Sequence, residues 1–243
     1  AIVEAGCIPL LIAALQGALS RHSETAQEHA VTVLSELAPI GSNASMIKES
    51  DGIEPMVALL SIGNADAKER AASTLGHLAL RAEAAIEITM AGAVTAFVKW
   101  LVDPSLGPPE VAARALSEIA LDNPDTQAQI AEEGAIESLI AMIESWAAAA
   151  AAAAEGGGVS VSSMALKLAT VAAGCLATLA KDHAVNQIII TEEGGIPPLL
   201  QLLKDKAGTA HEKATKALWH LAETEDNKTL IPRAGGIAPL VAL

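Results

Sequence analysis

A short phrase built around a glycine occurs six times along the 243-residue chain. In each copy a small or apolar residue follows the glycine, and four copies place a proline three residues after it. The six glycines are Gly6, Gly52, Gly92, Gly134, Gly195 and Gly236. Successive copies lie 46, 40, 42, 61 and 41 residues apart, so the period is about 41 residues. A period of this length predicts a stacked array of similar units rather than a compact globular fold.

A second phrase, Ala-x3-Leu-x2-(Leu/Ile)-Ala, lies between the glycine phrases. Its i, i+4, i+7, i+8 spacing places the apolar residues on one face of a helix. The central leucines are Leu34, Leu75, Leu116, Leu176 and Leu218. From each leucine to the next glycine the separation is 17 to 19 residues, whereas from glycine to leucine it varies from 23 to 42. Each unit therefore reads as a short helix, a glycine turn, a second helix, a loop of variable length and a longer third helix.

The glycine turn has a physical reason. A sharp turn between two helices needs a residue that tolerates positive φ and close backbone approach, so we expect all six glycines to have this role. The prolines Pro9, Pro55, Pro198 and Pro239 fall in the first turn of the following helix, where a missing N–H costs little.

The two phrases divide the chain into four full and two partial repeats. The predicted boundaries are 1–40, 41–81, 82–122, 123–182, 183–224 and the partial repeat 225–243. The fourth repeat is longer than its neighbours because of residues 147–163, which begin with eight alanines and continue with glycines and serines. We expect a helical extension followed by a flexible linker there. A tolerated surface expansion is favoured over a partner-binding arm.

Composition supports an all-helical fold. About a fifth of the chain is alanine, and the aromatic residues are one Phe, three Trp and no Tyr. Small side chains must therefore fill the core, which favours closely packed helices over sheets. The two cysteines, Cys7 and Cys175, lie within apolar helical patterns, as expected of reduced cysteines in an intracellular compartment that the sequence does not specify.

Charge and hydropathy exclude two classes of partner at the level of sequence. The net charge of −14 argues against nucleic acid, because phosphate binding needs a basic surface. The charge-free apolar run 146–154 is about half the length of a membrane-spanning helix, so no membrane insertion is expected. Neither end of the chain has the polar cap that closes a repeat array. We therefore expect a piece of a longer array, or ends covered by other chains in a larger complex.

No pattern typical of catalysis occurs. The chain lacks the glycine-rich nucleotide loops, the Gly-x-Ser-x-Gly nucleophile elbow and Cys-x-x-Cys. The histidines include no pair at the i, i+4 spacing used by zinc sites on helices. We therefore predict a protein that is not an enzyme and that holds no cofactor or metal.

The three-helix unit, with its Gly-(Ile/Ala)-x-Pro-Leu-(Val/Leu) second helix and its Ala-x3-Leu-x2-Leu-Ala third helix, resembles the armadillo repeat family along the whole chain. The segment 193–203, Glu-Gly-Gly-Ile-Pro-Pro-Leu-Leu-Gln-Leu-Leu, especially resembles the repeats of plant, algal and vacuolar armadillo proteins. The resemblance implies an all-α, right-handed α-solenoid, a superhelix with three helices per repeat. It also implies that partner proteins bind in a groove lined by the third helices.

Positions six before, two before and two after each central leucine share the helix face that would line this groove. The predicted contact residues are Glu28, Glu36, Glu69, His77, Glu110, Arg114, Glu118, Thr178, Glu212, Lys216 and His220. The importin-alpha branch of the family carries Trp and Asn ladders at the last two positions. Here Thr32, Ser73, Arg114, Gly174 and Lys216 replace the Trp, so that binding mode loses its aromatic slots. The recurring Glu six residues before the leucine is better explained by the helix dipole than by a basic partner.

The three tryptophans, Trp100, Trp146 and Trp219, are expected to pack in the core or on ridges. Trp146 lies beside the insertion and is the best single candidate for a contact at the edge of the array, since exposed tryptophans mark binding hot spots.

The leading hypothesis is a non-catalytic scaffold, or a structural subunit of a larger assembly, that binds other proteins through the third-helix groove and the edges of the array. One alternative is a transport adaptor that carries a basic peptide, as importin-alpha does. Another is a membrane-anchored adaptor like the vacuolar relatives, which would need a lipidated N-terminus.

Overall fold

The computed structural model describes residues 6–154, 162–204 and 208–237, and these residues form fifteen helices and no strand. The prediction of an all-α repeat fold is confirmed. The chain divides into two compact units, Ala1–Thr126 (unit 1) and Gln127–Leu243 (unit 2). Each unit is a stack of helical repeats, and the single continuous solenoid and its repeat boundaries remain predictions.

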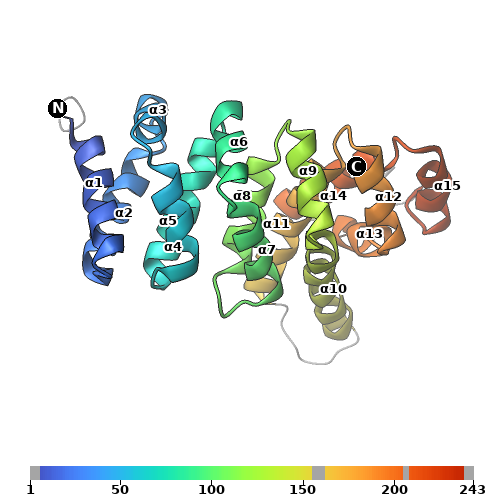
Figure 1. Cartoon of the computed structure of the whole chain (residues 1–243). Coiled ribbons are helices and arrows are strands. Elements are labelled where there is room, and N and C mark those ends of the chain that lie inside the picture. Colours follow the sequence, from blue (N-terminus) through green and yellow to red (C-terminus); the bar gives the residue numbers. More distant parts are fainter. Residues whose placement is uncertain (1–5, 155–161, 205–207, 238–243) are drawn as a thin grey trace. The chain divides into compact units, whose positions relative to one another are not determined.

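Unit 1 contains one partial and two complete three-helix repeats (Figure 1). Its helices are α1 (Cys7–Ser20), α2 (Glu24–Leu37), α3 (Gly41–Glu49), α4 (Ile53–Ile62), α5 (Ala65–Ala79), α6 (Ala82–Met90), α7 (Ala93–Val102) and α8 (Pro109–Ile119). Within each repeat the second helix packs on the third, as α4 does on α5, and successive third helices α2, α5 and α8 pack side by side. Helix α9 (Pro124–Glu132) contains the division between the two units.

Unit 2 repeats the arrangement. Its helices after α9 are α10 (Ala135–Ala154), α11 (Ser163–Ala180), α12 (Ala184–Glu192), α13 (Ile196–Lys204), α14 (Gly208–Leu221) and α15 (Glu225–Arg233). The alanine run of the insertion continues α10 as a helix, as expected, whereas the linker predicted after it falls largely in residues 155–161, outside the described residues. Helix α11 begins after Ser162, whose hydroxyl accepts a hydrogen bond from the Met164 N–H.

The predicted stripe of the third helices forms the core. The five central leucines are at most 1% exposed, and the alanines four residues before them are at most 5% exposed. A methyl side chain at these alanine positions lets neighbouring helices approach closely. The free thiol of Cys175 is also part of this core, and burial raises its pKa to about 12, so it is chemically inert.

The turn glycines separate into two kinds, which corrects the expectation that all six have the same role. Gly6, Gly92 and Gly134 have positive φ angles of 75°, 87° and 83°. In the other three copies the residue before the glycine takes the left-handed conformation instead, as Gly194 does with φ 80°. The glycine that follows it, such as Gly195, faces the Ile190 side chain and carbonyl, where an added Cβ would lie 2.8 Å from either. The turn therefore uses glycine for backbone freedom at three positions and for close packing at the other three.

An unpredicted feature joins successive repeats. The third residue of a first helix is asparagine in three repeats, and its amide donates to a carbonyl in the last turn of the preceding third helix. The bonds are Asn43 Nδ2 to Leu37 O (3.0 Å), Asn186 Nδ2 to Leu179 O (2.9 Å) and Asn227 Nδ2 to Leu221 O (2.9 Å). These amides satisfy carbonyls that a helix end leaves without partners. At the two remaining junctions the same position holds Ala84 and Thr126.

By length and composition alone, two described helices could cross a membrane, Ala135–Ala153 of α10 and Ser163–Ala180, which is α11. The bent pair α6 and α7 would be a third if counted as one span. The expectation that no segment is long and apolar enough is wrong on this measure, because it considered only runs free of charge. In this fold 33% and 50% of the two spans is buried, where α10 and α11 pack on each other and on α13 and α14.

Candidate functional site

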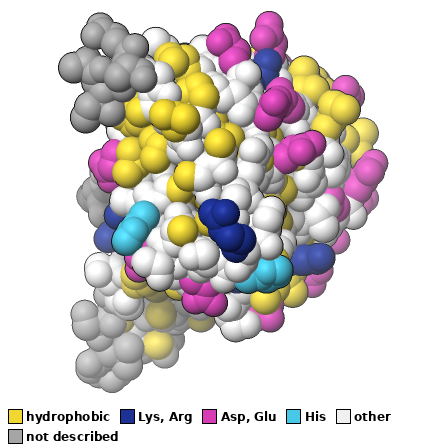
Figure 2. Space-filling model, turned by 60° about the vertical axis from the view of Figure 1, so that its left-hand side comes forward, with side chains coloured by type: hydrophobic (Ala, Val, Ile, Leu, Met, Phe, Trp, Pro, Cys, Tyr) yellow, Lys and Arg dark blue, Asp and Glu magenta, His cyan; other side chains and the backbone are white. Residues whose placement is uncertain are grey.

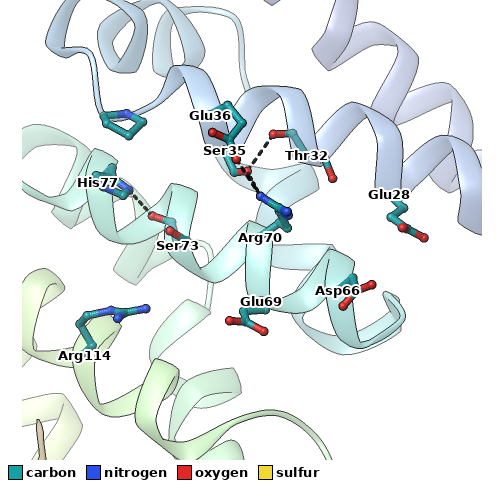
Figure 3. A pocket seen from close by; sticks show the side chains of 11 residues that line it. Glu28, Thr32, Ser35, Glu36, Asp66, Glu69, Arg70, Ser73, His77 and Arg114 are labelled. Atoms are coloured by element: carbon teal, nitrogen blue, oxygen red, sulfur yellow. Dashed lines mark hydrogen bonds and ion pairs between the residues drawn. The ribbon is translucent and has the colours of Figure 1, made fainter.

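A groove of about 540 Å³ lies over the third helices of unit 1 (Figure 3). It is lined by Glu28, Thr32, Ser35, Glu36, Pro39, Asp66, Glu69, Arg70, Ser73, His77 and Arg114. These side chains come from α2, α5 and α8 and from the residues directly after α2. Five of the predicted contact residues, Glu28, Glu36, Glu69, His77 and Arg114, are therefore brought together in one groove.

One end of the groove, the acidic end, is formed by Glu28, Asp66 and Glu69. Glu28 is held in place by Asn64, whose amide donates to the Glu28 carboxylate at 3.1 Å while its own carbonyl oxygen caps α5 at the Ala67 N–H. Asp66 and Glu69 are exposed, and within the described part of the chain neither carboxylate forms a hydrogen bond or ion pair. The N-terminal half of α5 thus presents two carboxylates to solvent beside a fixed third one.

The middle of the groove carries an internal ion pair. Arg70 Nη1 donates to Glu36 Oε1 at 2.9 Å and to Ser35 Oγ at 3.4 Å, and the Ser35 hydroxyl in turn donates to the Thr32 carbonyl at 2.8 Å. Figure 3 shows the Arg70 side chain reaching from α5 toward α2 across the groove. Because the Arg70 and Glu36 side chains are 41% and 72% exposed, this pair is screened by water and contributes little to stability.

The other end, the basic end, is formed by His77 and Arg114. His77 Nδ1 lies 2.7 Å from the Ser73 carbonyl oxygen. Since a carbonyl only accepts, Nδ1 must carry the proton, and in the neutral ring Nε2 is then an acceptor. The Arg114 side chain is exposed and extends from α8 into the groove (Figure 3), and it forms no ion pair with any residue that the structure describes.

Glu118 lies on α8, four residues after Arg114, but it does not line the groove. Its carboxylate lies on the bare backbone of α5 at Gly76, in the space that a Cβ would occupy. Burial raises the pKa of Glu118, while the nearby charges of Arg114 and His77 lower it by less. Glu110, also predicted to contact a partner, is half-buried in the first turn of α8.

In unit 2 the same register positions behave differently. Thr178 is 7% exposed and donates to the Gly174 carbonyl, and His220 is 4% exposed with Nδ1 3.0 Å from Glu223 Oε1. Both were expected to face a groove, and that expectation is wrong. Glu212 and Lys216 do lie exposed on α14.

The tryptophans correct the sequence interpretation as well. Trp146 is 3% exposed and packs in the core of unit 2, so it is not an edge contact. Trp219, expected in the core or on a ridge, is 64% exposed and stacks on His220 with ring centroids 4.7 Å apart. It lines an apolar hollow of about 390 Å³ with Leu218, Ile231 and Pro232 among others. Trp100 is buried against Phe97, as expected.

A signal for the exposure of Trp219 was present in the sequence. The residue directly after the central leucine is small in the other four third helices, Ser35, Gly76, Ser117 and Ala177. A tryptophan at this position departs from the template.

Acidic side chains are spread over the face of the molecule seen in Figure 2, and basic ones are few there, as the net charge of −14 implies. Among the described residues, no group of three or more His, Cys, Asp or Glu side chains has the geometry of a metal site.

Repeats of three helices, whose third helices stack side by side beneath a polar groove, define an α-solenoid repeat protein. Residues 184–223 match the model of the armadillo/beta-catenin-like repeat. Residues 184–223 are therefore identified as an armadillo repeat.

Solved structures show the same fold along nearly the whole chain. One similar structure is a designed armadillo repeat protein, with a TM-score of 0.81 and 20% identity over 97% of this chain and 91% of that one. Another is an engineered protein, with a TM-score of 0.79 and 26% identity over 97% of this chain and 88% of that one. A third is a designed armadillo repeat protein in complex with peptide (KR)4, with a TM-score of 0.78, 20% identity and coverage of 97% and 91%. Among curated proteins no sequence matches the chain.

Proposed function

We propose that this protein is a non-catalytic binding scaffold and that the groove of unit 1 holds an extended segment of a partner protein. The observation that carries the proposal is the groove itself. It combines exposed carboxylates at one end and an exposed guanidinium at the other with hydroxyl and imidazole groups between the third helices. Such groups suit the hydrogen bonds and ion pairs of a peptide backbone with polar side chains.

The similar structures support this proposal. One of them is described as a crystal structure of computationally designed armadillo repeat proteins for modular peptide recognition, and another contains a bound peptide. The groove of this chain lies over the third helices, where the family resemblance predicts a partner. The mode of binding must differ from a tryptophan and asparagine ladder, because Thr32, Ser73 and Arg114 stand in place of the aromatic residues.

A transport adaptor for a basic peptide is a second candidate, favoured by the acidic end of the groove and by the (KR)4 peptide bound to one of the similar designed proteins. The internal pair of Arg70 with Glu36 and the unpaired Arg114 oppose it, since both place positive charge where a basic peptide would lie.

The test is binding of a fluorescent peptide library to the full chain, with variants that fill the groove. Ser73→Trp places a large side chain in the groove between Arg70 and His77. We expect it to weaken binding of the best library peptide at least about tenfold. Ser61→Trp is the matched control, because Ser61 is an exposed serine of α4 in the same unit but outside the groove.

Two results would overturn the proposal. One is a library in which no peptide binds the wild-type protein. The other is equal affinity of the selected peptide for the wild type and for the Ser73→Trp variant, which would place binding elsewhere on the molecule.

A further inference from the structure

The groove of unit 1 has charges of opposite sign at its two ends. We propose that it selects a charge-separated segment, with basic side chains at the acidic end and a carboxylate at the basic end. This inference rests on the proposed peptide-binding function and specifies the chemistry of the partner.

The middle of the groove is already neutralised. The Arg70 guanidinium lies on the Glu36 carboxylate at 2.9 Å and on the Ser35 hydroxyl at 3.4 Å. A ligand lysine that paired with Glu36 would displace the Arg70 guanidinium. The positive charge of Arg70 would then lie unpaired beside the lysine. Arg70 therefore occupies the position of a ligand side chain and discourages a uniformly basic segment.

The acidic end is open and partly preorganised. The Asn64 amide holds the Glu28 carboxylate at 3.1 Å, so this acceptor is fixed before a ligand arrives. Asp66 and Glu69 are exposed, and no described cation pairs with them. Three carboxylates in one end of a groove, with no internal cation, match one or two lysine or arginine side chains.

The basic end has the opposite preference. Arg114 offers a guanidinium with no described carboxylate in ion-pair distance, and a guanidinium binds a carboxylate through two parallel hydrogen bonds. The Glu118 carboxylate interacts electrostatically with Arg114, but it is turned onto α5 at Gly76 and forms no ion pair with the guanidinium. His77 adds a polar nitrogen whose tautomer is set by the Ser73 carbonyl.

The geometry limits the spacing of the two charges. Packed helices lie about 8–10 Å apart, so α2 and α8, with α5 between them, are separated by roughly 16–20 Å. An extended chain rises about 3.3 Å per residue, so about five or six residues span the groove. Figure 3 shows Glu28 and Asp66 on one side of the view and His77 and Arg114 on the other. Asp66 and His77 lie near opposite ends of α5, so the proposed segment follows this helix while it passes from α2 to α8.

The experiment uses peptides of equal length, and their binding to the 243-residue chain is measured by fluorescence anisotropy at low salt. Two peptides carry two lysines and two glutamates separated by four neutral residues, one with the lysines first and one with the glutamates first. A third peptide carries four lysines, and a fourth is neutral. We expect one of the charge-separated peptides to bind at least about tenfold more tightly than the all-lysine peptide.

Charge reversal at the basic end should invert this preference. Arg114→Glu is expected to weaken the charge-separated peptide at least about tenfold and to strengthen the all-lysine peptide. Arg21→Glu is the matched control, because it makes the same change of net charge at an exposed site after α1, outside the groove, and should leave the order of affinities unchanged.

The outcomes separate the two proposals. If the all-lysine peptide binds the wild type more tightly than both charge-separated peptides, the selectivity inferred here is wrong while peptide binding in the groove stands. If Arg114→Glu and Arg21→Glu change the peptide affinities in the same way, Arg114 does not bind the carboxylate of the ligand and the inferred selectivity is wrong. If none of these peptides and no library peptide binds, the proposed function itself fails.

Discussion

His77 in unit 1 and His220 in unit 2 occupy the same register position, two residues after the central leucine, yet only one of them reaches a groove. His77 follows Gly76 and lines the open surface of α5, with Nδ1 on a carbonyl of its own helix. His220 follows Trp219, which stacks on its ring, and it is 4% exposed. The half-buried histidine of the groove thus follows a glycine, whereas the buried histidine follows a large tryptophan side chain that stacks on it.

Away from this position the two units treat their polar side chains alike in one respect. Unit 1 places carboxylates and guanidinium groups along its third helices, where they face solvent. Both units place amides between their helices, and in unit 1 Gln27 and Asn43 are each 3% exposed and donate to backbone carbonyls. The described part of unit 2 has four such amides. Gln127, Asn186, Gln187 and Asn227 are each at most 3% exposed and donate to backbone carbonyls. One repeat template therefore carries charged side chains at its surface and amides between its helices.

The largest effect on stability is expected when a core side chain of unit 2 is removed. Trp146→Ala should lower the free energy of unfolding by about 3–5 kcal/mol, because a buried aromatic ring is replaced by a cavity. Urea denaturation followed by far-UV circular dichroism measures this change. Trp219→Ala is the control, since Trp219 is largely exposed and should lose less than about 1 kcal/mol. Equal losses for the two variants would contradict the burial described for unit 2.

Removing the asparagine hydrogen bonds between repeats should have a smaller effect on stability. Asn186→Ala and Asn227→Ala should each lower the free energy of unfolding by about 1–3 kcal/mol, because each leaves a buried leucine carbonyl without its donor. The same denaturation measurement applies. Gln129→Ala is the control, since its amide donates to the Glu133 side chain in the same turn rather than to another helix. A control variant as unstable as the asparagine variants would show that the amides are not the cause.

The smallest effect concerns Glu118, and it depends on pH. Burial raises the pKa of this carboxyl above its value of 4.5 in an unfolded chain. The folded state therefore binds the proton more tightly, so its stability relative to the unfolded state falls as pH rises from below 4.5 through the raised pKa. Glu118→Gln should remove this loss and make the protein more stable than the wild type at neutral pH.

Urea denaturation at pH 4, 5.5 and 7 checks this expectation. Glu54→Gln is the control, because Glu54 is an exposed glutamate of α4. If the free energy of unfolding falls by the same amount between pH 4 and pH 7 in the wild type and in the Glu118→Gln variant, the effect does not come from Glu118.

The repeat period predicted much of the fold from the sequence. The stripe around Leu34 and Leu75 is buried as expected, because a helix face with regular i, i+4, i+7 spacing has only one way to pack against its neighbours. The division of the glycine roles was not predicted. Two adjacent positions can supply the left-handed residue, and the sequence pattern does not distinguish them.

The site was predicted only where neighbouring repeats follow the template. In unit 1 the offset rule brings Glu28, Glu69 and Arg114 to one groove. It fails for Thr178 and His220, because an offset counts residues along one helix and ignores the size of the side chains around it. The pair of Arg70 with Glu36 was not found, since it joins two repeats and Arg70 lies one position outside the offset pattern.

The asparagine amides have a further consequence, for cooperativity. An array of repeats unfolds as a chain of units coupled to their nearest neighbours, and its weakest coupling decides where it opens first. In unit 2 both junctions between successive repeats carry the amide, at Asn186 and Asn227. In unit 1 the junction at Asn43 carries it, whereas the next one holds Ala84. Amide hydrogen exchange should therefore begin earlier around α6 than around α12, so the unit that carries the polar groove is also expected to open more readily.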